Sequence, residues 1–329
     1  MSVQTGDRAP GWLIWLALLI VYVVWGSTYL AIKLVVETMP PLLSASARFL
    51  VAGLVVYGVL VARRGPGVIR LTRAELLGAG FVGLALLLGG NGLVMLGERH
   101  VPSGLAALII AVVPLWVMVL RLAFSESVRR GTLLGVLVGF AGVGVLVLPR
   151  GMSGDVALGG MLMLVLAGAS WAIGSYYSRR LSLPGDPLVS TSAQLILGGL
   201  GLAAAGLVSG ELGLVRFERF SAESVISLVY LVLFGSILAY TAYTWLLQAT
   251  TVSKVSTYAY VNPVVAILLG WLVLREQITL SIIVGGAMIV VAVGVVIRTE
   301  SRPPDEAGAR EAPPAHVALG DESGRLRPG

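Results

Sequence analysis

The two halves of the chain repeat one another as apolar segments, each long enough to cross a membrane. Residues 25–54 align without a gap on residues 171–200, and eight of the 30 aligned pairs are identical. Later in each half, Pro114 and Pro263 precede carboxylates at a membrane end, Glu126 and Glu276. Each half holds five such segments, an odd number, so the second copy crosses in the opposite sense to the first. The pattern predicts two inverted five-helix repeats.

Composition places this repeat in lipid. The chain is 57% hydrophobic and 12% charged, with a mean hydropathy of +0.92, whereas a soluble domain carries about 25% charged residues. We therefore expect an all-α integral membrane protein whose solvent is the lipid bilayer. The net charge of +6 resides mostly in loops and the tail, so no nucleic-acid partner is expected. The ten expected helices cover residues 11–32, 41–62, 74–96, 102–122, 131–149, 156–178, 188–209, 224–247, 254–274 and 280–298.

The domain organisation follows from these segments. The first repeat is expected over residues 11–149 and the second over 156–298. Residues 299–329 are rich in Pro, Gly, Ala and charge and are expected to form a disordered tail. An inside N-terminus puts 15 Lys and Arg residues on the inner side and six on the outer side. This bias predicts a multi-pass protein of the cell inner membrane with both termini cytoplasmic.

Arg48 is the one ionisable residue well inside an expected span. It lies about seven residues into the second span, roughly 10 Å below the outer boundary. A functional interpretation is that Arg48 binds a substrate carboxylate, or latches an outer gate with Glu98 or Glu37. The alternative is that it snorkels to the interface or caps helix carbonyls. A structural or gating role is favoured over direct substrate contact; the repeat counterpart is the neutral Gln194.

Aromatic and polar side chains recur at helical spacing along several spans. Because polar groups in lipid seek protein or water, these faces are expected to turn inward. They predict a cavity for a polar, partly apolar solute. For each residue alone, helix packing or an interfacial position is the alternative, and it is weakest for the repeat-equivalent Trp25 and Trp171. The cavity candidates are Trp25, Tyr29, Asn91, Trp171, Ser175, Tyr176, Tyr240, Tyr243, Tyr258 and Asn262.

Two further features bear on helix geometry. Pro114 and Pro263 are expected to break or kink the fourth and ninth spans, and a static kink and a moving hinge stay open as alternatives. Gly131, Gly135 and Gly139 form a small-residue ridge that suits dimerisation or packing within the chain. The second is favoured, and a homodimer stays open.

The sequence lacks the residues that several kinds of site chemistry require. No Asp or Glu lies mid-span, so no midplane carboxylate is available for a proton relay or a sodium site. The chain has no cysteine, no GxxxxGK[ST] and only two histidines, His100 and His316. No cofactor, no metal site and no enzymatic activity are therefore expected. A sensor or scaffold is disfavoured because the only long polar segment is the tail, whereas a channel is harder to exclude.

Short motifs also carry a family resemblance over residues of about 11–298. The chain resembles EamA-type permeases of the drug/metabolite transporter superfamily, and within it the drug/metabolite exporters. One departure is Ser125 before Glu126, where the family often has Gly. The matching stretches are Trp25 to Tyr29, the run around Arg48, Gly90 to Gly92, Val101 to Gly104, and Tyr258 to Pro263.

The resemblance implies ten helices around a central cavity, lined by spans one, three, four, six, eight and nine. It also implies alternating access and the export of amino acids or related metabolites. We therefore expect a secondary transporter that exports small neutral or zwitterionic metabolites, with a small molecule as its partner. Export of toxic hydrophobic or cationic drugs is the alternative, and a channel-like facilitator is a third. Transport is expected to occur by facilitated diffusion, or to be coupled to protons through Glu98 or His100.

Overall fold

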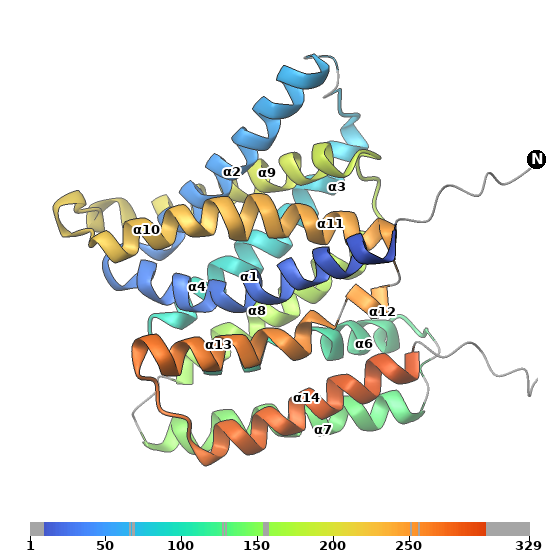
Figure 1. Cartoon of the computed structure of the whole chain (residues 1–329), viewed down its shortest axis with the longest axis vertical. Helices are drawn as coiled ribbons and strands as arrows, with labels where there is room; N and C mark the ends of the chain where they lie inside the picture. The colour runs from blue at the N-terminus through green and yellow to red at the C-terminus, as the bar shows by residue number, and fades with distance from the viewer. Residues whose placement is uncertain are drawn as a thin grey trace, which may run out of the picture.

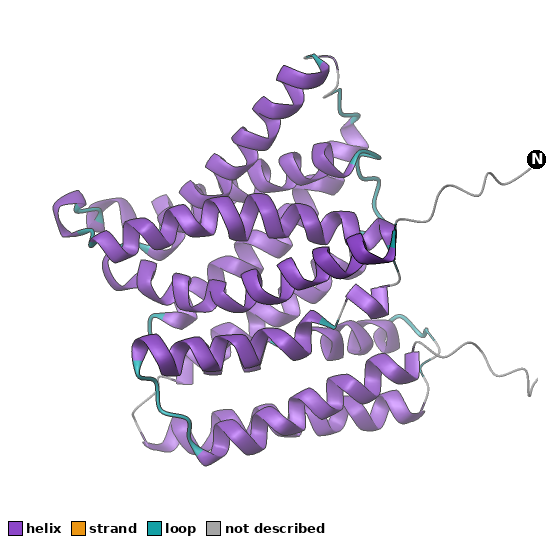
Figure 2. Cartoon of the chain, viewed as in Figure 1, coloured by secondary structure: helices purple, strands orange, loops and turns teal. Residues whose placement is uncertain are grey.

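The chain folds into helices joined by short connections, and the part that the structure describes contains no strand (Figure 2). Eight of its helices are long and apolar enough to cross a membrane, and two shorter apolar helices, Gly131–Leu146 and Val261–Leu274, accompany them. The chain is therefore an all-α integral membrane protein with ten crossing segments. The computed structural model describes residues 10–65, 67, 70–126, 128, 130–153, 158–250, 252–255 and 257–300.

The first repeat follows the predicted segments closely. The largest difference is in the first helix, which continues six residues beyond the expected end at residue 32 because the buried Val35 and Val36 prolong its apolar face past Lys33. The third crossing is built from three consecutive pieces and the fourth from two. The elements are α1 (Gly11–Thr38), α2 (Pro41–Arg64), α3 (Arg73–Gly83), the π-helix η2 (Leu84–Gly92), α4 (Leu93–Glu98), α5 (Ser103–Ile110), α6 (Val113–Ala123) and α7 (Arg130–Ser153).

The second repeat has the same order of elements. Its third crossing again contains a π-helix at its centre, and two short 3₁₀ turns precede that crossing. The last helix reaches Glu300, and the rest of the expected tail, residues 301–329, lies outside the described residues. The elements are α8 (Leu158–Tyr177), α9 (Pro187–Val208), η3 (Glu211–Leu214), η4 (Phe217–Arg219), α10 (Ala222–Tyr230), the π-helix η5 (Leu231–Leu238), α11 (Ala239–Ala249), α12 (Val252–Val255), α13 (Tyr258–Leu274) and α14 (Leu280–Glu300).

Local signals fix several helix starts. A proline occupies the first turn of both α2 and α9, where a missing N–H removes no helical hydrogen bond. Thr72 and Glu75 form a capping box at the start of α3: the Thr72 hydroxyl accepts from the Glu75 N–H at 3.2 Å, and the Glu75 carboxylate accepts from the Thr72 N–H at 2.9 Å. Asp186 caps α9 by accepting from the Leu188 N–H at 2.8 Å.

Equivalent helices of the two repeats pack on each other. α2 lies against α9 and α7 against α14, at opposite edges of the molecule (Figure 1). At the first pair, the Ser46 hydroxyl donates to the Gly199 carbonyl at 2.9 Å, and the Ser192 hydroxyl donates to the Gly53 carbonyl at 3.1 Å. Ser46 and Ser192 are repeat-equivalent, as are Gly53 and Gly199, so one pseudo-two-fold axis relates both bonds.

The second pair explains the glycine ridge of α7. A Cβ at Gly135 would lie 2.7 Å from Val296 Cγ2 and 3.2 Å from the Ala292 carbonyl, both in α14. Such a close approach leaves no room for a side chain. The ridge therefore packs within the chain, as the favoured interpretation expected, and a homodimer stays a prediction that this ridge does not support.

The helices cross between two faces of the molecule, here called the near face and the far face. The near face holds the start of α1, Gly65 and the connection 178–186. The far face holds the connections 99–102, 209–221 and 275–279. In Figure 1 the near face is on the right. Large apolar side chains such as Leu134, Leu137 and Trp271 are more than half exposed between the two faces, as expected of a surface that lipid covers.

Candidate functional site

A central cavity of about 80 Å³ lies among the helices. Its lining is mostly apolar and aromatic with a few polar groups, the composition typical of a small-molecule site. It contains no Asp or Glu among the described residues. The helices α1, α8 and α13 contribute as the resemblance implies, and α2 does so as well, through Arg48 and Phe49. Arg48, for which a structural or gating role was favoured, lines the cavity as well. Seven of the ten cavity candidates line it: Trp25, Tyr29, Asn91, Trp171, Tyr240, Tyr258 and Asn262.

An aromatic cluster around Trp25 forms one wall of this cavity. The Trp25 ring meets Trp171 edge to face at 6.0 Å, Tyr258 at 5.4 Å and Tyr243 at 4.9 Å between ring centroids. Trp25 Nε1 donates to the Gly235 carbonyl at 3.2 Å, which fixes the orientation of the indole. The cluster joins three crossings of the second repeat to the first helix of the first.

The two asparagines of the lining are tied to backbone. Asn91 Nδ2 donates to the Leu86 carbonyl within the π-helix η2 at 3.4 Å. The Asn262 amide, oriented so that both of its ends are satisfied, donates to the carbonyls of Tyr22 at 3.1 Å and Tyr258 at 3.2 Å. Both amides therefore spend part of their hydrogen-bonding capacity on the helices that hold them.

The two π-helices bring backbone to the cavity. η2 and η5 occupy equivalent places in the third crossing of each repeat, and each contributes a glycine to the lining. A Cβ at Gly90 would lie 2.9 Å from the Trp171 ring, and one at Gly235 would lie 3.0 Å from Arg48 Nη2. π-Helical turns often mark functional sites. An apolar periodicity in the sequence does not reveal them, so the sequence alone did not indicate these two segments.

Arg48 is buried with only 4% of its surface exposed. Its Nε donates to the Ser236 hydroxyl at 2.8 Å, and its guanidinium lies 4.6 Å from the centre of the Phe49 ring. Its Nη1 is buried and has no hydrogen-bond partner. None of the ion pairs found among the described residues includes Arg48. The latch to Glu98 or Glu37 considered above is therefore absent in this conformation, and Glu37 is exposed at the end of α1.

Glu98 ends α4 close to the far face and is fully buried. Neither of its carboxyl oxygens has a hydrogen-bond partner. The Lys33 amine instead donates to the backbone carbonyls of Glu98 at 2.6 Å and Val101 at 3.3 Å. These bonds join α1 to the connection between α4 and α5.

Further polar contacts close the far face. The Glu276 carboxylate accepts from the N–H groups of Ser103 at 2.7 Å and Gly104 at 3.1 Å, at the start of α5. Glu211 does the same at the start of α2, accepting from Leu42 at 3.1 Å and Leu43 at 2.9 Å. Carboxylates at helix N-termini satisfy free N–H groups and interact favourably with the helix dipole.

A second cavity, of about 510 Å³, lies at the near face. Ser175, Tyr240 and Tyr243 line it, and Tyr240 also lines the central cavity, so this one residue borders both. The Tyr240 hydroxyl donates to Gln194 Oε1 at 2.7 Å. Arg179, the repeat counterpart of Lys33, lines this cavity too. The Lys33 contact thus closes the far face, while its counterpart faces a cavity at the near face.

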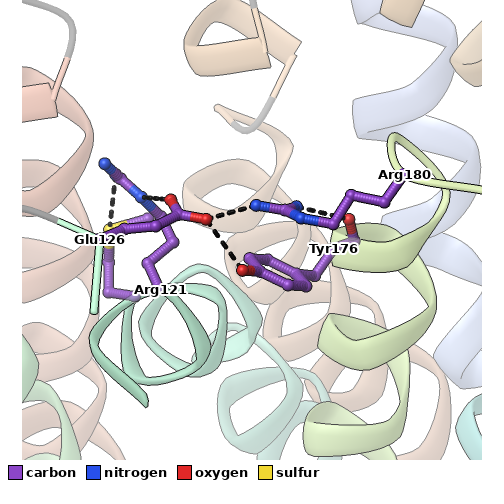
Figure 3. A network of polar contacts seen from close by, with 5 residues as sticks. Arg121, Glu126, Tyr176 and Arg180 are labelled. Atoms are coloured by element: carbon purple, nitrogen blue, oxygen red, sulfur yellow. Dashed lines mark hydrogen bonds and ion pairs between the residues drawn. The ribbon is translucent and has the colours of Figure 1, made fainter. Parts of the chain in front are cut away.

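Tyr176 lines neither cavity. It lies at the near end of α8, where its hydroxyl donates to Glu126 Oε1 at 2.8 Å (Figure 3). Its ring stacks on Phe124. Glu126 also pairs with Arg180 and accepts from Arg121 Nε at 3.0 Å. The Tyr176 hydroxyl, followed by the two guanidinium groups, holds the pKa of Glu126 below its usual value. This cluster ties the end of α6 to the end of α8.

The two prolines act differently. The fourth crossing breaks at Ala111 and Val112, and Pro114 stands in the first turn of the helix that resumes there. Pro263 lies inside α13, which continues through it as helix. In the ninth crossing the helix is interrupted earlier, between α12 and α13. The break is therefore found at Pro114 and not at Pro263.

Comparison with known proteins agrees with this architecture. The chain is 37% identical over 255 residues to the uncharacterised inner membrane transporter YedA of Escherichia coli strain K12, covering 77% of this chain and 80% of that protein. It is 27% identical to the uncharacterised transporter YvbV of Bacillus subtilis strain 168, covering 87% and 92%. A crystal structure with 19% identity superposes with a TM-score of 0.60 over 89% of this chain and 98% of the other, which supports the fold.

The family match covers both repeats. The EamA-like transporter family matches the chain twice, over residues 12–148 and again over residues 158–298. Together these matches span most of the chain and meet at the boundary between the two five-helix repeats. The chain is thus a membrane transporter and belongs to the EamA-like transporter family.

Proposed function

We propose that the chain exports small neutral or zwitterionic metabolites, such as amino acids or related compounds, by alternating access. It would do so as a secondary transporter in the cell inner membrane, with its near face and both termini in the cytoplasm. The excess of Lys and Arg on the near face supports this orientation. The name of the relative YedA places that protein in the inner membrane. The substrate would be moved without any change to its covalent bonds.

The lining of the central cavity carries the proposal. Aromatic rings from both repeats offer apolar surface, and Asn91, Asn262 and tyrosine hydroxyls offer polar contacts. Such a mixture suits a small solute with a polar end and an apolar end. The cavity lies between inverted repeats, where secondary transporters hold their substrates.

The contacts at the two faces support loading of the substrate from one side. Lys33, Glu276 and Glu211 close the far face with hydrogen bonds to backbone. The near-face cavity borders the central one through Tyr240. A substrate would therefore load from the near face in this conformation, which is the cytoplasmic side in the proposed orientation.

A cationic drug fits the cavity less well. The described lining carries one guanidinium and no carboxylate, so a permanent cation would meet like charge without a counter-ion. A channel is disfavoured by the hydrogen bonds that join α1 to the connection before α5 and so close one face.

Two measurements test the proposal. Cells that produce the chain and are loaded with dipeptides should release the derived amino acids faster than cells that lack it. In proteoliposomes, replacing Trp25, Asn91, Trp171 and Asn262 together by alanine should abolish counterflow, while Trp271→Ala, at a half-exposed site, should not. Unchanged flux in the fourfold variant would overturn the central cavity as the transport site.

A further inference from the structure

We propose that the Arg48 guanidinium binds a carboxylate of the transported substrate, so that the substrates are amino acids and other small monocarboxylates. The inference rests on the proposed function and deepens it. It reverses the preference for a structural or gating role that the sequence alone favoured. Three observations carry it: most N–H groups of Arg48 have no hydrogen-bond partner among the described residues, Arg48 forms no ion pair there, and its side chain lines the central cavity.

The hydrogen bonds of Arg48 are largely unmade. A guanidinium has five N–H donors in a planar fork. Here only Nε has a partner, the Ser236 hydroxyl at 2.8 Å, and Nη1 is buried with none. Burying a charge without paired hydrogen bonds is costly. A guanidinium fork matches the two oxygens of a carboxylate better than any other group, so a bound carboxylate would supply what the protein leaves out.

No carboxylate of the described chain fills this role. Glu37 is exposed, and Glu98 interacts electrostatically with Arg48 but forms no hydrogen bond or ion pair with it among the described residues. Glu276 and Glu211 are already engaged with backbone N–H groups at helix starts. Among the described residues, no carboxylate therefore forms an ion pair or a hydrogen bond with the Arg48 guanidinium, and a bound ligand carboxylate would supply this contact.

The surroundings of Arg48 leave room for such a ligand. Arg48 lines the central cavity together with Thr28, Asn91 and Trp171. The Gly235 backbone packs against one side of the guanidinium, since a Cβ there would lie 3.0 Å from Nη2, so a ligand would approach from the cavity side. The substrate carboxylate would sit at this end of the cavity and its apolar part against Trp25 and Trp171. An ammonium group would meet tyrosine rings and hydroxyls, which attract cations.

The test compares matched compounds on the full chain in proteoliposomes. Leucine, its carboxamide and its deaminated acid, 4-methylpentanoate, are each assayed for counterflow, and the same three forms are used for phenylalanine. The wild type should exchange both carboxylates at least about tenfold faster than the carboxamide, the size expected for hydrogen bonds to a charged group. Arg48→Gln should reduce carboxylate exchange to the carboxamide rate and leave the carboxamide rate unchanged.

Two control variants separate this role from a gate. Glu98→Gln should keep the preference for carboxylates. Gly235→Ala should weaken it, because the added methyl group crowds the guanidinium. If Arg48→Gln and Glu98→Gln instead lower the exchange of all compounds by one factor, Arg48 is a gating latch and the inference is overturned while the proposed function stands.

The wild type alone can also decide the matter, which covers the case in which Arg48→Gln does not fold. Equal exchange of an amino acid and its carboxamide would overturn the carboxylate subsite and leave the proposed function intact. If wild-type protein with a normal melting temperature exchanges none of the six compounds, the proposed function fails and the inference fails with it.

Discussion

Trp25 and Trp171, which occupy equivalent positions in the two repeats, meet edge to face with their ring centroids 6.0 Å apart and their planes at 87°. The same residue type is therefore used twice, once from each side of the pseudo-two-fold axis. Because edge-to-face packing directs the positive rim of one ring at the negative face of the other, the pair is not a symmetric stack. The two indoles hence present different surfaces to the same cavity.

The first prediction concerns these indoles. Trp25→Ala and Trp171→Ala should each lower the initial rate of counterflow about tenfold, since each loses an aromatic contact and apolar surface for the solute. Trp271→Ala is the matched control because its side chain is half exposed on α13. Initial rates in proteoliposomes at equal protein density provide the comparison. Equal losses in all three variants would point to a general effect of removing tryptophan.

The second prediction concerns the α2–α9 interface. A Cβ at Gly53 would lie 2.8 Å from Ile196 Cγ1, whereas one at Gly58, on the same helix, meets nothing within 4 Å. Gly53→Ala should lower stability by about 1–3 kcal/mol through overpacking. Gly58→Ala should leave it unchanged or raise it by up to about 1 kcal/mol. Thermal unfolding of the purified protein in detergent measures both, and a lowered midpoint for both variants would contradict the interpretation.

The third prediction concerns the cap that Glu211 provides. Its two carboxylate oxygens accept from Leu42 at 3.1 Å and Leu43 at 2.9 Å, at the start of α2. Glu211→Gln should cost about 0.5–2 kcal/mol, because an amide supplies one acceptor and no negative charge to this helix start. Glu218→Gln, at an exposed position in the same connection, should change the melting temperature little.

The fourth prediction concerns acid stability at the near face. The pKa of Glu126 is lowered in the folded protein by the Tyr176 hydroxyl, Arg121 and Arg180. The stabilisation by its carboxylate is therefore present above the unfolded pKa and is lost as the pH falls through the lower, folded pKa. The melting temperature of the wild type should fall more steeply on acidification than that of Glu126→Gln. Arg180→Gln should give an intermediate slope, and parallel curves for all three would refute the assignment.

The fifth prediction concerns orientation. The chain has no cysteine, so a single introduced thiol is labelled without background. Gly185 and Gly213 lie in connections at the near and far face, and a side chain at either meets nothing within 4 Å. In intact cells a membrane-impermeant maleimide should label Gly213→Cys, and should label Gly185→Cys only after permeabilisation. The reverse pattern would invert the proposed topology and the direction of transport.

The crossing segments could be predicted from the sequence because a run of about 20 apolar residues in a bilayer has few alternatives to a helix. The same argument located the repeat, because Trp25 and Trp171 or Ser46 and Ser192 align without a gap. The helix ends were less well defined. α1 runs on to Thr38 because Val35 and Val36 continue its buried face beyond the single charge of Lys33.

The site could be predicted only in part. Stripes of aromatic residues predicted which faces turn inward, and seven of the ten cavity candidates line the central cavity. Tyr176 was placed with them because it lies beside Ser175, yet adjacent residues on a helix point about 100° apart. The π-helices, the Lys33 contact and the Ser236 partner of Arg48 depend on contacts between distant segments, which a single sequence does not specify.

The paired bonds from Ser46 to the Gly199 carbonyl and from Ser192 to the Gly53 carbonyl have a consequence for energetics. A pseudo-two-fold axis in the membrane plane exchanges these two bonds, so under the proposed alternating access a conformation open to the opposite side would contain the same two bonds with their roles swapped. This interface is therefore degenerate with respect to the direction of opening and gives neither conformation an advantage. A preference of the substrate-free protein for one of the two conformations has to arise where the repeats differ, as they do at Lys33 and Arg179. Substitutions along α2 and α9 should thus change the stability of the fold. Substitutions at Lys33 and Arg179 should change the relative populations of the conformations open to either side.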